Sequence, residues 1–265
     1  MRVHDPSTRH PCNTAPLQHG TPATRHPCNT APLQHGTPAT RHPCNTASVC
    51  GVVSLPGLRV VTVTNLKGGS GKSTGAGLLA HAWASAGRRV IAVDADPQGT
   101  LTRWAQDGEW TIPVFGLATN KLHAELSGIV NQDRFDVVVI DTPPLELQRG
   151  IVYSAMRAAT DVVVTLAPTA SEWDVLPAVW GALDEVEPLR TQPVVVSVLW
   201  NRVRANTTSS TVYRDLLAAS GRHSCRSVIP LAERYAQAIG GPVILRAEDT
   251  AVRDAADEIA QRGGW

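Results

Sequence analysis

The chain contains 265 residues, of which 43% are hydrophobic and 18% charged, and its formal net charge at pH 7 is +1. This length accommodates one α/β domain of ordinary size together with an additional segment. No apolar run is long enough to span a bilayer, and the N-terminus lacks the apolar core of a secretory signal. The composition therefore argues against a membrane protein and predicts a cytoplasmic location.

The first part of the chain, residues 1–57, is dominated by a repeat of sixteen residues. The octapeptide TRHPCNTA begins at Thr8, at Thr24 and at Thr40, and PLQHGTPA fills the two intervals. Pro, Thr and His are abundant and large apolar residues are scarce, so we expect this segment to be disordered. Its near-perfect periodicity is typical of translated tandem DNA repeats. We therefore expect the natural start of the protein to lie further in, near Val52 or Val60.

Three His-Pro-Cys units in the repeat segment raise the alternative of a metal site. A proline between the potential ligands and the lack of a matching Cys-x-x-Cys pattern argue against it. Beyond residue 57 the only cysteine is Cys225. Disulfide bonds, and iron–sulfur ligation by paired cysteines within one chain, are therefore not expected.

A strand, a glycine-rich loop and a helix are predicted in succession from Val60 onward. Residues 60–64 mix β-branched and polar side chains like a short buried strand, and KGGSGKST follows at residues 67–74. Residues 75–86 are small and apolar, with larger side chains at helical spacing. A phosphate-binding loop requires this context, whereas the alternative is an ordinary solvated loop.

The residue types of this loop suit an anion with several phosphates. Gly68, Gly69 and Gly71 can adopt conformations that turn successive N–H groups inward around an anion at a helix N-terminus. Lys72 would reach the β- and γ-phosphates, and the Ser73 hydroxyl would complete a magnesium shell.

A second lysine, Lys67, distinguishes the loop from the common G-x-x-x-x-G-K-[ST] pattern, in which Leu66 would be glycine. One loop cannot easily wrap both amines around one phosphate, so Lys67 is expected to serve a nucleotide bound by a partner subunit. This spacing resembles the deviant Walker A motif of the ParA/MinD family of dimeric ATPases. The resemblance implies ATP and Mg²⁺ as cofactors, a catalytic role for Lys67 and Lys72, and nucleotide contacts from Gly68, Gly69, Ser70, Gly71, Lys72, Ser73 and Thr74.

Two carboxylates follow the next predicted strand, residues 90–93. They lie in the sequence DADPQG as Asp94 and Asp96, at the edge where open parallel sheets place their ligands. A simple turn is the alternative, because Asp, Pro and Gly form turns. One carboxylate could orient the attacking water and the other could assist the magnesium shell. The stretch resembles the second motif of the family, which implies a role in hydrolysis for Asp96 and leaves Asp94 as the candidate metal residue.

A third acid, Asp141, follows the continuous apolar run at residues 137–140, after a helix expected near residues 120–130. An acid at this place can hold magnesium through water. A solvated carboxylate at a strand end is the alternative. The sequence DTPP that begins at Asp141 is again similar to ParA proteins.

Further strands are predicted at residues 162–167 and 193–200, with a helix at residues 173–186 between them. Asn201 is expected to end the later strand. In the family an Asn at this point, and backbone near a later Pro, flank the adenine, which implies the same for Asn201 and Pro230. A helix or strand cap is the alternative for Asn201.

Positive charge is concentrated between Arg190 and Arg234. This stretch contains seven Arg residues and only two acids, Asp215 and Glu233. Such a stripe can bind DNA phosphates without reading the base sequence, and a solvated surface is the alternative. ParA dimers bind nonspecific DNA through C-terminal Arg residues. The resemblance therefore makes six of the seven Arg residues in this stretch candidates for DNA contact: Arg202, Arg204, Arg214, Arg222, Arg226 and Arg234.

The last predicted helix, residues 248–262, is rich in Ala and Asp and lacks the basic, bulky character of a membrane-targeting tail. We predict a doubly wound, mostly parallel twisted sheet with helices on both faces over residues 58–265, the P-loop NTPase fold. The short form of the ParA family, without an N-terminal helix-turn-helix, is the form that this chain resembles.

The resemblance implies a DNA-segregation ATPase located on the nucleoid. ATP would bridge two subunits into a homodimer that binds nonspecific DNA, and hydrolysis stimulated by a ParB-like adaptor would release it. Two alternatives stay open: a positioning ATPase whose cargo is a protein cluster, and a P-loop metabolic ligase resembling dethiobiotin synthetase.

Overall fold

The computed structural model describes residues 57–205 and 207–265. Apart from Gly57, the repeat segment lies outside the described residues, and so does the prediction that it is disordered.

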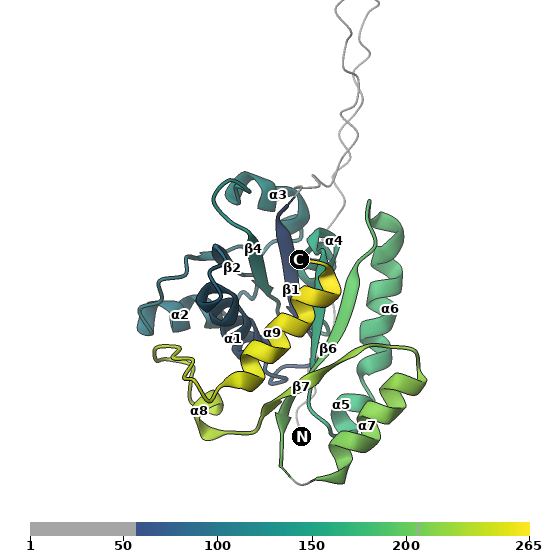
Figure 1. Ribbon diagram of the computed structural model, residues 1–265. Helices are drawn as coiled ribbons and strands as arrows, with labels where there is room; N and C mark the ends of the chain where they lie inside the picture. The colour runs from purple at the N-terminus through teal and green to yellow at the C-terminus, as the bar shows by residue number, and fades with distance from the viewer. Residues whose placement is uncertain (1–56, 206) are drawn as a thin grey trace, which may run out of the picture. The chain divides into compact units, whose positions relative to one another are not determined.

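A seven-stranded sheet forms the centre of the described chain, and all neighbouring strands are parallel (Figure 1). The order of strands across the sheet is β3-β2-β4-β1-β5-β6-β7. This confirms the predicted α/β fold class. The strands are β1 (Arg59–Thr64), β2 (Val90–Asp94), β3 (Val114–Gly116), β4 (Val137–Asp141), β5 (Asp161–Leu166), β6 (Val195–Val203) and β7 (Ser224–Pro230).

The four central strands, β2, β4, β1 and β5, are buried along almost their whole length. A parallel strand covered by helices on both faces needs a continuous apolar run, which is the signal that predicted β2 and β4. Strand β1 was predicted from its mix of β-branched and polar residues. The register pairs Asp94 with Asp141 and Asp141 with Val63. The carboxyl ends of β2, β4 and β1 therefore meet at one edge of the sheet.

Helices cover both faces of the sheet (Figure 1). On one face α1 and α9 pack together, and the Trp83 indole N–H donates to the main-chain carbonyl of Ala256 at 3.1 Å. On the other face α4 contacts α3 and α6. The helices are α1 (Lys72–Ser85), α2 (Thr100–Asp107), α3 (Leu122–Ile129), α4 (Arg149–Ala158), α5 (Ala170–Trp173), α6 (Leu176–Val186), α7 (Thr208–Ala219), α8 (Glu233–Ala236) and α9 (Thr250–Gly263).

Several elements differ from the sequence predictions. Strand β6 continues through Asn201 to Val203, so Asn201 lies within the strand and does not end it. The predicted helix at residues 173–186 is divided into α5 and α6, because Pro177 has no N–H and favours the first turn of a new helix. The sequence analysis did not identify β3, α2, α4, α7, β7 or α8.

Two glycines in the first part of α1 are explained by close packing. A Cβ at Gly77 would lie 2.5 Å from Trp104 Cζ3 and 2.9 Å from Trp110. A Cβ at Gly75 would lie 3.2 Å from Thr165 Cγ2 on β5. The glycines therefore weaken the intrinsic helix propensity of α1 but let the helix approach the sheet and the tryptophans closely.

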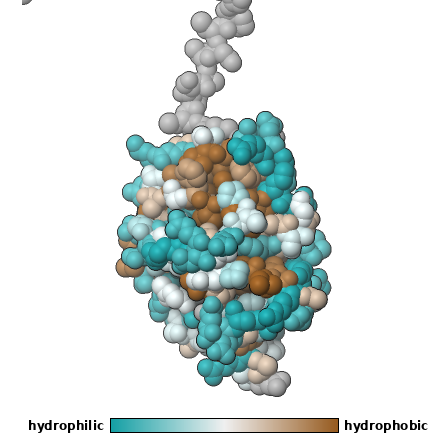
Figure 2. All heavy atoms as spheres, turned by 90° about the vertical axis from the view of Figure 1, so that its left-hand side faces the viewer, coloured by the Kyte–Doolittle hydropathy of each residue, from teal (hydrophilic) through white to brown (hydrophobic). Residues whose placement is uncertain are grey.

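The surface of the described chain mixes apolar and polar side chains. Figure 2 shows one side, on which apolar areas are separated by hydrophilic ones. Phe115, Ile239 and Ile244 are among the exposed large apolar residues of the described chain. Among the residues described, no helix combines the length and the apolar character needed to cross a membrane.

The packing around Gly77 predicts the effect of adding one methyl group there. Gly77→Ala should lower the free energy of unfolding by about 1–3 kcal/mol, because the methyl group overlaps the Trp104 ring. Gly181→Ala on α6 is the matched control, since no other part of the described chain lies within 4 Å of the added methyl group. It should raise stability by about 0.5–1 kcal/mol through helix propensity. Urea unfolding of both variants checks the prediction, and equal effects at the two positions would contradict it.

Candidate functional site

The glycine-rich loop forms a cradle of main-chain N–H groups between β1 and α1. Gly69 and Gly71 have φ angles of 73° and 85°, in the left-handed region that favours glycine. Gly71 is the N-cap of α1 and no side chain caps the helix there. The first N–H groups of a helix have no partner within the helix, so this end of α1 is suited to an anion.

Lys72 lies buried beneath this loop and turns its amine back toward it. Lys72 Nζ donates to the main-chain carbonyl of Lys67 at 2.8 Å. Burial lowers the pKa of Lys72, whereas the negative charges of Asp141, Asp96 and Glu172 act in the opposite direction. The structure thus brings Asp96 and Asp141 near the predicted loop lysine, and the strand register sets Asp94 beside Asp141.

Lys67 lies differently from Lys72. Its side chain is partly exposed, and Lys67 Nζ lies 3.4 Å from the main-chain carbonyl oxygen of Ser171 on α5. The two lysines of the loop are therefore separated: one amine lies inside the cradle and the other lies against α5.

Asp141 is the carboxylate best placed to attract a cation. It is fully buried at the end of β4, and among the described residues neither of its oxygens has a hydrogen-bond partner of normal geometry. Burial raises the pKa of Asp141 to about 7, against the effect of the nearby Ser73 hydroxyl. Two unpartnered buried oxygens beside a hydroxyl fit a magnesium ion that is held through water.

Asp94 and Asp96 are engaged with the chain around them. One oxygen of Asp94 accepts from the N–H and the hydroxyl of Thr102 at 2.8 and 2.9 Å, and the other accepts from the N–H of Asp96 at 3.2 Å. Asp96 Oδ1 accepts from the N–H of Gln98 at 2.9 Å. Asp94 therefore fixes the start of α2, and Asp96 shapes the turn that faces Lys72.

The described residues contain no group of three or more His, Cys, Asp or Glu side chains arranged to hold a metal. A magnesium ion at Asp141 and Ser73 would therefore need oxygen ligands from water and phosphate. This is the usual manner of binding for this ion.

Asn201 and Pro230, predicted to flank a base, lie together beside the loop. They border a hollow of about 60 Å³ with Gly71, Thr74 and Arg202. Asn201 Nδ2 donates to the main-chain carbonyl of Ser70 at 3.4 Å. A Cβ at Gly71 would lie 2.1 Å from the same nitrogen, so this close approach also requires glycine.

The sequence analysis missed a buried polar network that holds the start of the loop. Asn65 Nδ2 donates to the main-chain carbonyl of Thr165 at 2.5 Å and to Glu172 Oε2 at 3.0 Å. Arg202 Nη2 donates to Glu172 Oε1 at 3.2 Å. The spacing of Thr169 and Glu172 is a helix-start signal that could have located α5. The long-range contact with Asn65 had no signal in the sequence.

Most of the Arg residues predicted to contact DNA already have a partner within the chain. Arg202 pairs with Glu172, and Arg234 Nε lies 2.9 Å from Asp249 Oδ1. Arg214 donates to the main-chain carbonyls of Cys225 and Arg226, and the Arg222 guanidinium lies 4.7 Å from the centre of the Trp180 ring. Arg204 and Arg226 are exposed. Arg214, Arg222 and Arg226 gather near the first half of β7, whereas Arg202, Arg204 and Arg234 lie elsewhere.

Comparison with known proteins identifies a family and several relatives. The family described as the CobQ/CobB/MinD/ParA nucleotide binding domain matches residues 61–241. A carboxysome distribution protein A of Gloeobacter kilaueensis is 39% identical over 118 residues, which are 44% of this chain and 53% of that protein. The chromosome-partitioning ATPase Soj of Thermus thermophilus is 32% identical over 162 residues, or 50% of this chain and 63% of that protein. Each match covers less than two thirds of the relative.

Among solved structures, the cell division protein MinD of Aquifex aeolicus has a TM-score of 0.62 to this chain. The match covers 77% of this chain and 97% of that chain at 18% identity. This likeness confirms the fold that was predicted from the strand pattern and the loop.

The burial of Asp141 predicts a dependence of stability on pH. Its pKa is about 7 in the folded chain and 3.8 for the unperturbed group, so the folded chain binds this proton more tightly than the unfolded chain. The contribution of Asp141 to stability is therefore lost as the pH rises from about 4 to about 7. In EDTA and without nucleotide, Asp141→Asn should be more stable than the parent protein at pH 8, by on the order of 3 kcal/mol. This difference should shrink steadily as the pH is lowered toward 5.

Urea unfolding at pH 5, 6, 7 and 8 measures this difference. Asp136→Asn is the control, because Arg89 holds the pKa of Asp136 at about 2, below the tested range. Its effect should be the same at all four pH values. An Asp141→Asn effect that is equally independent of pH would show that Asp141 does not titrate there.

Proposed function

Because the chain belongs to the CobQ/CobB/MinD/ParA nucleotide binding domain family, we propose that it is a DNA-segregation ATPase whose ATP-bound homodimer binds nonspecific DNA. A ParB-like adaptor would stimulate hydrolysis and thereby release the dimer. The observation that carries the proposal is the separation of the two loop lysines, one inside the cradle and one outside it.

This separation suits a nucleotide shared by two subunits. Lys72 would hold the β- and γ-phosphates of the ATP in its own cradle, together with the main-chain N–H groups of residues 68–74. Lys67 lies against α5, from which its flexible side chain can extend toward a triphosphate bound by a second subunit. Each ATP would then receive one lysine from each subunit.

The carboxylates at the sheet edge supply the remaining groups. Ser73 and Asp141 would hold magnesium, the latter through water, and the ion would neutralise charge on the phosphates. Asp96 would orient the attacking water, because it lies near enough to Lys72 to raise the pKa of that amine. Asp94 is proposed to act on the metal indirectly, by holding the turn that carries Asp96.

Nonspecific DNA binding is proposed for the Arg residues around β7. Arg214, Arg222 and Arg226 lie near one another, and Arg262 acts electrostatically on His223 in the same region. Arg204 would add to the contact from the end of β6. A dimer presents twice as many such cations as a monomer, so ATP-dependent dimerisation would control how long the protein stays on DNA. This would place the protein on the nucleoid.

A second candidate function is the positioning of a protein cluster. The 39% identity to a carboxysome distribution protein favours it, over 44% of this chain. The nucleotide chemistry and the DNA surface would be the same in both cases, and only the adaptor and its cargo would differ. A P-loop metabolic ligase is a third candidate, which ATP-dependent DNA binding would argue against.

Replacement of Lys67 tests the shared nucleotide. Lys67→Ala should leave the affinity of the monomer for ATP within about fivefold, because an exposed charge contributes roughly 1 kcal/mol or less. The same variant should lose the ATP-dependent dimer in light scattering. Lys121→Ala is the control, since Lys121 is exposed and lies outside the glycine-rich loop. Normal ATP-dependent dimers of Lys67→Ala would contradict a role for Lys67 across the interface.

Retention on DNA tests the partner and the cycle. Sedimentation with DNA should require ATP, should fail with ADP, and should weaken steeply with salt. Asp96→Ala should stay on DNA longer than the parent protein because it cannot hydrolyse ATP.

Arg226→Ala should lower the slope of log K against log salt by about 2 for the dimer, because one contact is lost per subunit. Arg134→Ala, on the turn before β4, should not change it. Retention of the parent protein on DNA that does not depend on the nucleotide would contradict the proposed function.

A further inference from the structure

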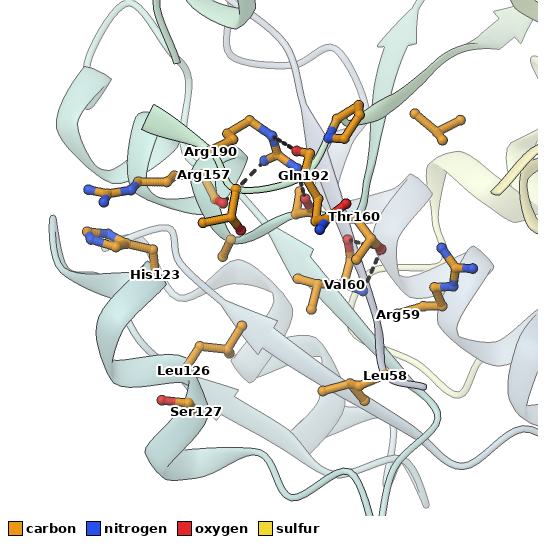
Figure 3. Close-up of a pocket in the computed structure, with 15 residues that line it drawn as sticks. Leu58, Arg59, Val60, His123, Leu126, Ser127, Arg157, Thr160, Arg190 and Gln192 are labelled. Atoms are coloured by element: carbon orange, nitrogen blue, oxygen red, sulfur yellow. Dashed lines mark hydrogen bonds between the residues drawn. The ribbon is translucent and has the colours of Figure 1, made fainter. Parts of the chain in front are cut away.

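A second cavity, of about 270 Å³, lies at the edge of the sheet opposite to the glycine-rich loop (Figure 3). The starts of β1 and β6 and the turn before β5 border it, together with α3 and the C-terminal end of α4. Strand β1 begins at this cavity and ends at the loop, so the two sites lie at opposite ends of the same strand. Nothing in the proposed nucleotide chemistry uses this cavity.

Part of the cavity wall is apolar. Leu58, Val60 and Val195 border it from the sheet side, and Leu126 borders it from α3 (Figure 3). Ligand pockets for drug-sized molecules have volumes of about 300–1,000 Å³. A hollow just below that range suits the apolar body of a smaller molecule.

The charged residues of the cavity wall are all basic. Arg59, Arg157 and Arg190 contribute to it, and among the described residues that line it there is no Asp or Glu. Arg190 is already used by the fold, because its guanidinium donates to the main-chain carbonyls of Met156, Arg157 and Ala159 at the end of α4. Arg59 turns away from the cavity (Figure 3). Its Nη2 lies 3.5 Å from the carbonyl oxygen of Gly264.

Arg157 is therefore the cation that the cavity offers to a ligand. Its Nε is buried, and among the described residues it has no hydrogen-bond partner. His123 lies beside it on α3, with Nδ1 2.8 Å from the Ser154 hydroxyl (Figure 3). Burial and the charge of Arg157 lower the pKa of His123, which disfavours a second positive charge beside Arg157.

Among the described residues no acid forms an ion pair with Arg157. Asp161 accepts from the Thr160 hydroxyl at 2.7 Å, and Glu187 lies 3.9 Å from Arg190 Nε. A buried guanidinium nitrogen without an acceptor costs free energy, which an anionic ligand would recover.

We propose that this cavity binds a small amphipathic carboxylate, whose carboxylate contacts Arg157 and whose apolar chain lies between Leu126 and the starts of β1 and β6. Charge and shape together select this class. A hydrophilic anion would leave the apolar wall uncovered, and a neutral hydrocarbon would leave Arg157 Nε without an acceptor.

Isothermal titration of the full chain with octanoate tests the proposal, with 1-octanol as the uncharged counterpart. Octanoate should bind with one site per chain and at least tenfold more tightly than 1-octanol. Arg157→Ala should weaken octanoate binding at least tenfold, because it removes a charge-assisted hydrogen bond. Arg149→Ala, on the same helix but paired with Glu185 on the surface, should bind octanoate like the parent protein.

A second variant tests the apolar wall. Leu126→Asp should also abolish octanoate binding, and circular dichroism and thermal unfolding should first show that each variant is folded. Should Leu126→Asp fail to fold, Leu126→Ala with a measurable loss of affinity replaces it. The proposal is wrong if octanoate does not bind, if 1-octanol binds equally well, or if Arg157→Ala and Arg149→Ala behave alike. ATP binding plays no part in this measurement, so its outcome is independent of the proposed function.

Discussion

The candidate site depends on one electrostatic interaction, between the buried amine of Lys72 and the buried carboxylate of Asp141 at the carboxyl edge of the sheet. Both side chains are buried, and each shifts the pKa of the other toward the charged form while burial acts against it. A buried acid without hydrogen bonds is costly unless a cation comes near. Asp141 is held in this position by the register of β4 beside β1, which places it level with the end of the strand that leads into the loop. The same arrangement prepares the site for a polyanion with its metal.

The rest of the site keeps this pair in place. The network of Asn65, Glu172 and Arg202 fixes the residue that precedes the loop, and Asn201 contacts the loop from β6. Helix α5 has a double role, since it supplies Glu172 to this network and the Ser171 carbonyl to Lys67. The Lys67 amine takes no part in the buried network, so it can leave that carbonyl without disturbing the network. The loop can therefore be rigid at its base while one of its lysines remains free to change partner.

The relation between sequence and structure was uneven along the chain. Strands β2 and β4 were predicted because burial on both faces demands continuous apolar runs, and the same requirement located Asp94 and Asp141 at strand ends. Helix α7 was missed because it begins with Thr and Ser residues of low helix propensity, and β3 because it has only three residues. Judged by helix propensity, Gly77 is unfavourable in α1. Its presence is explained by the tertiary structure, which places Trp104 where a larger side chain would be.

The sequence by itself determined the parallel α/β fold, the glycine-rich loop between a strand and a helix, and the acids at the strand ends, because each leaves a local pattern of spacing and residue type. The tertiary structure alone decided which of these acids lacks a partner, which lysine lies inside the cradle, and that Glu172 reaches Asn65 over a separation of 107 residues. It also showed that several of the Arg residues are engaged within the chain. Such contacts depend on the packing of segments far apart in sequence, and packing leaves no periodic signal in the residues that it joins.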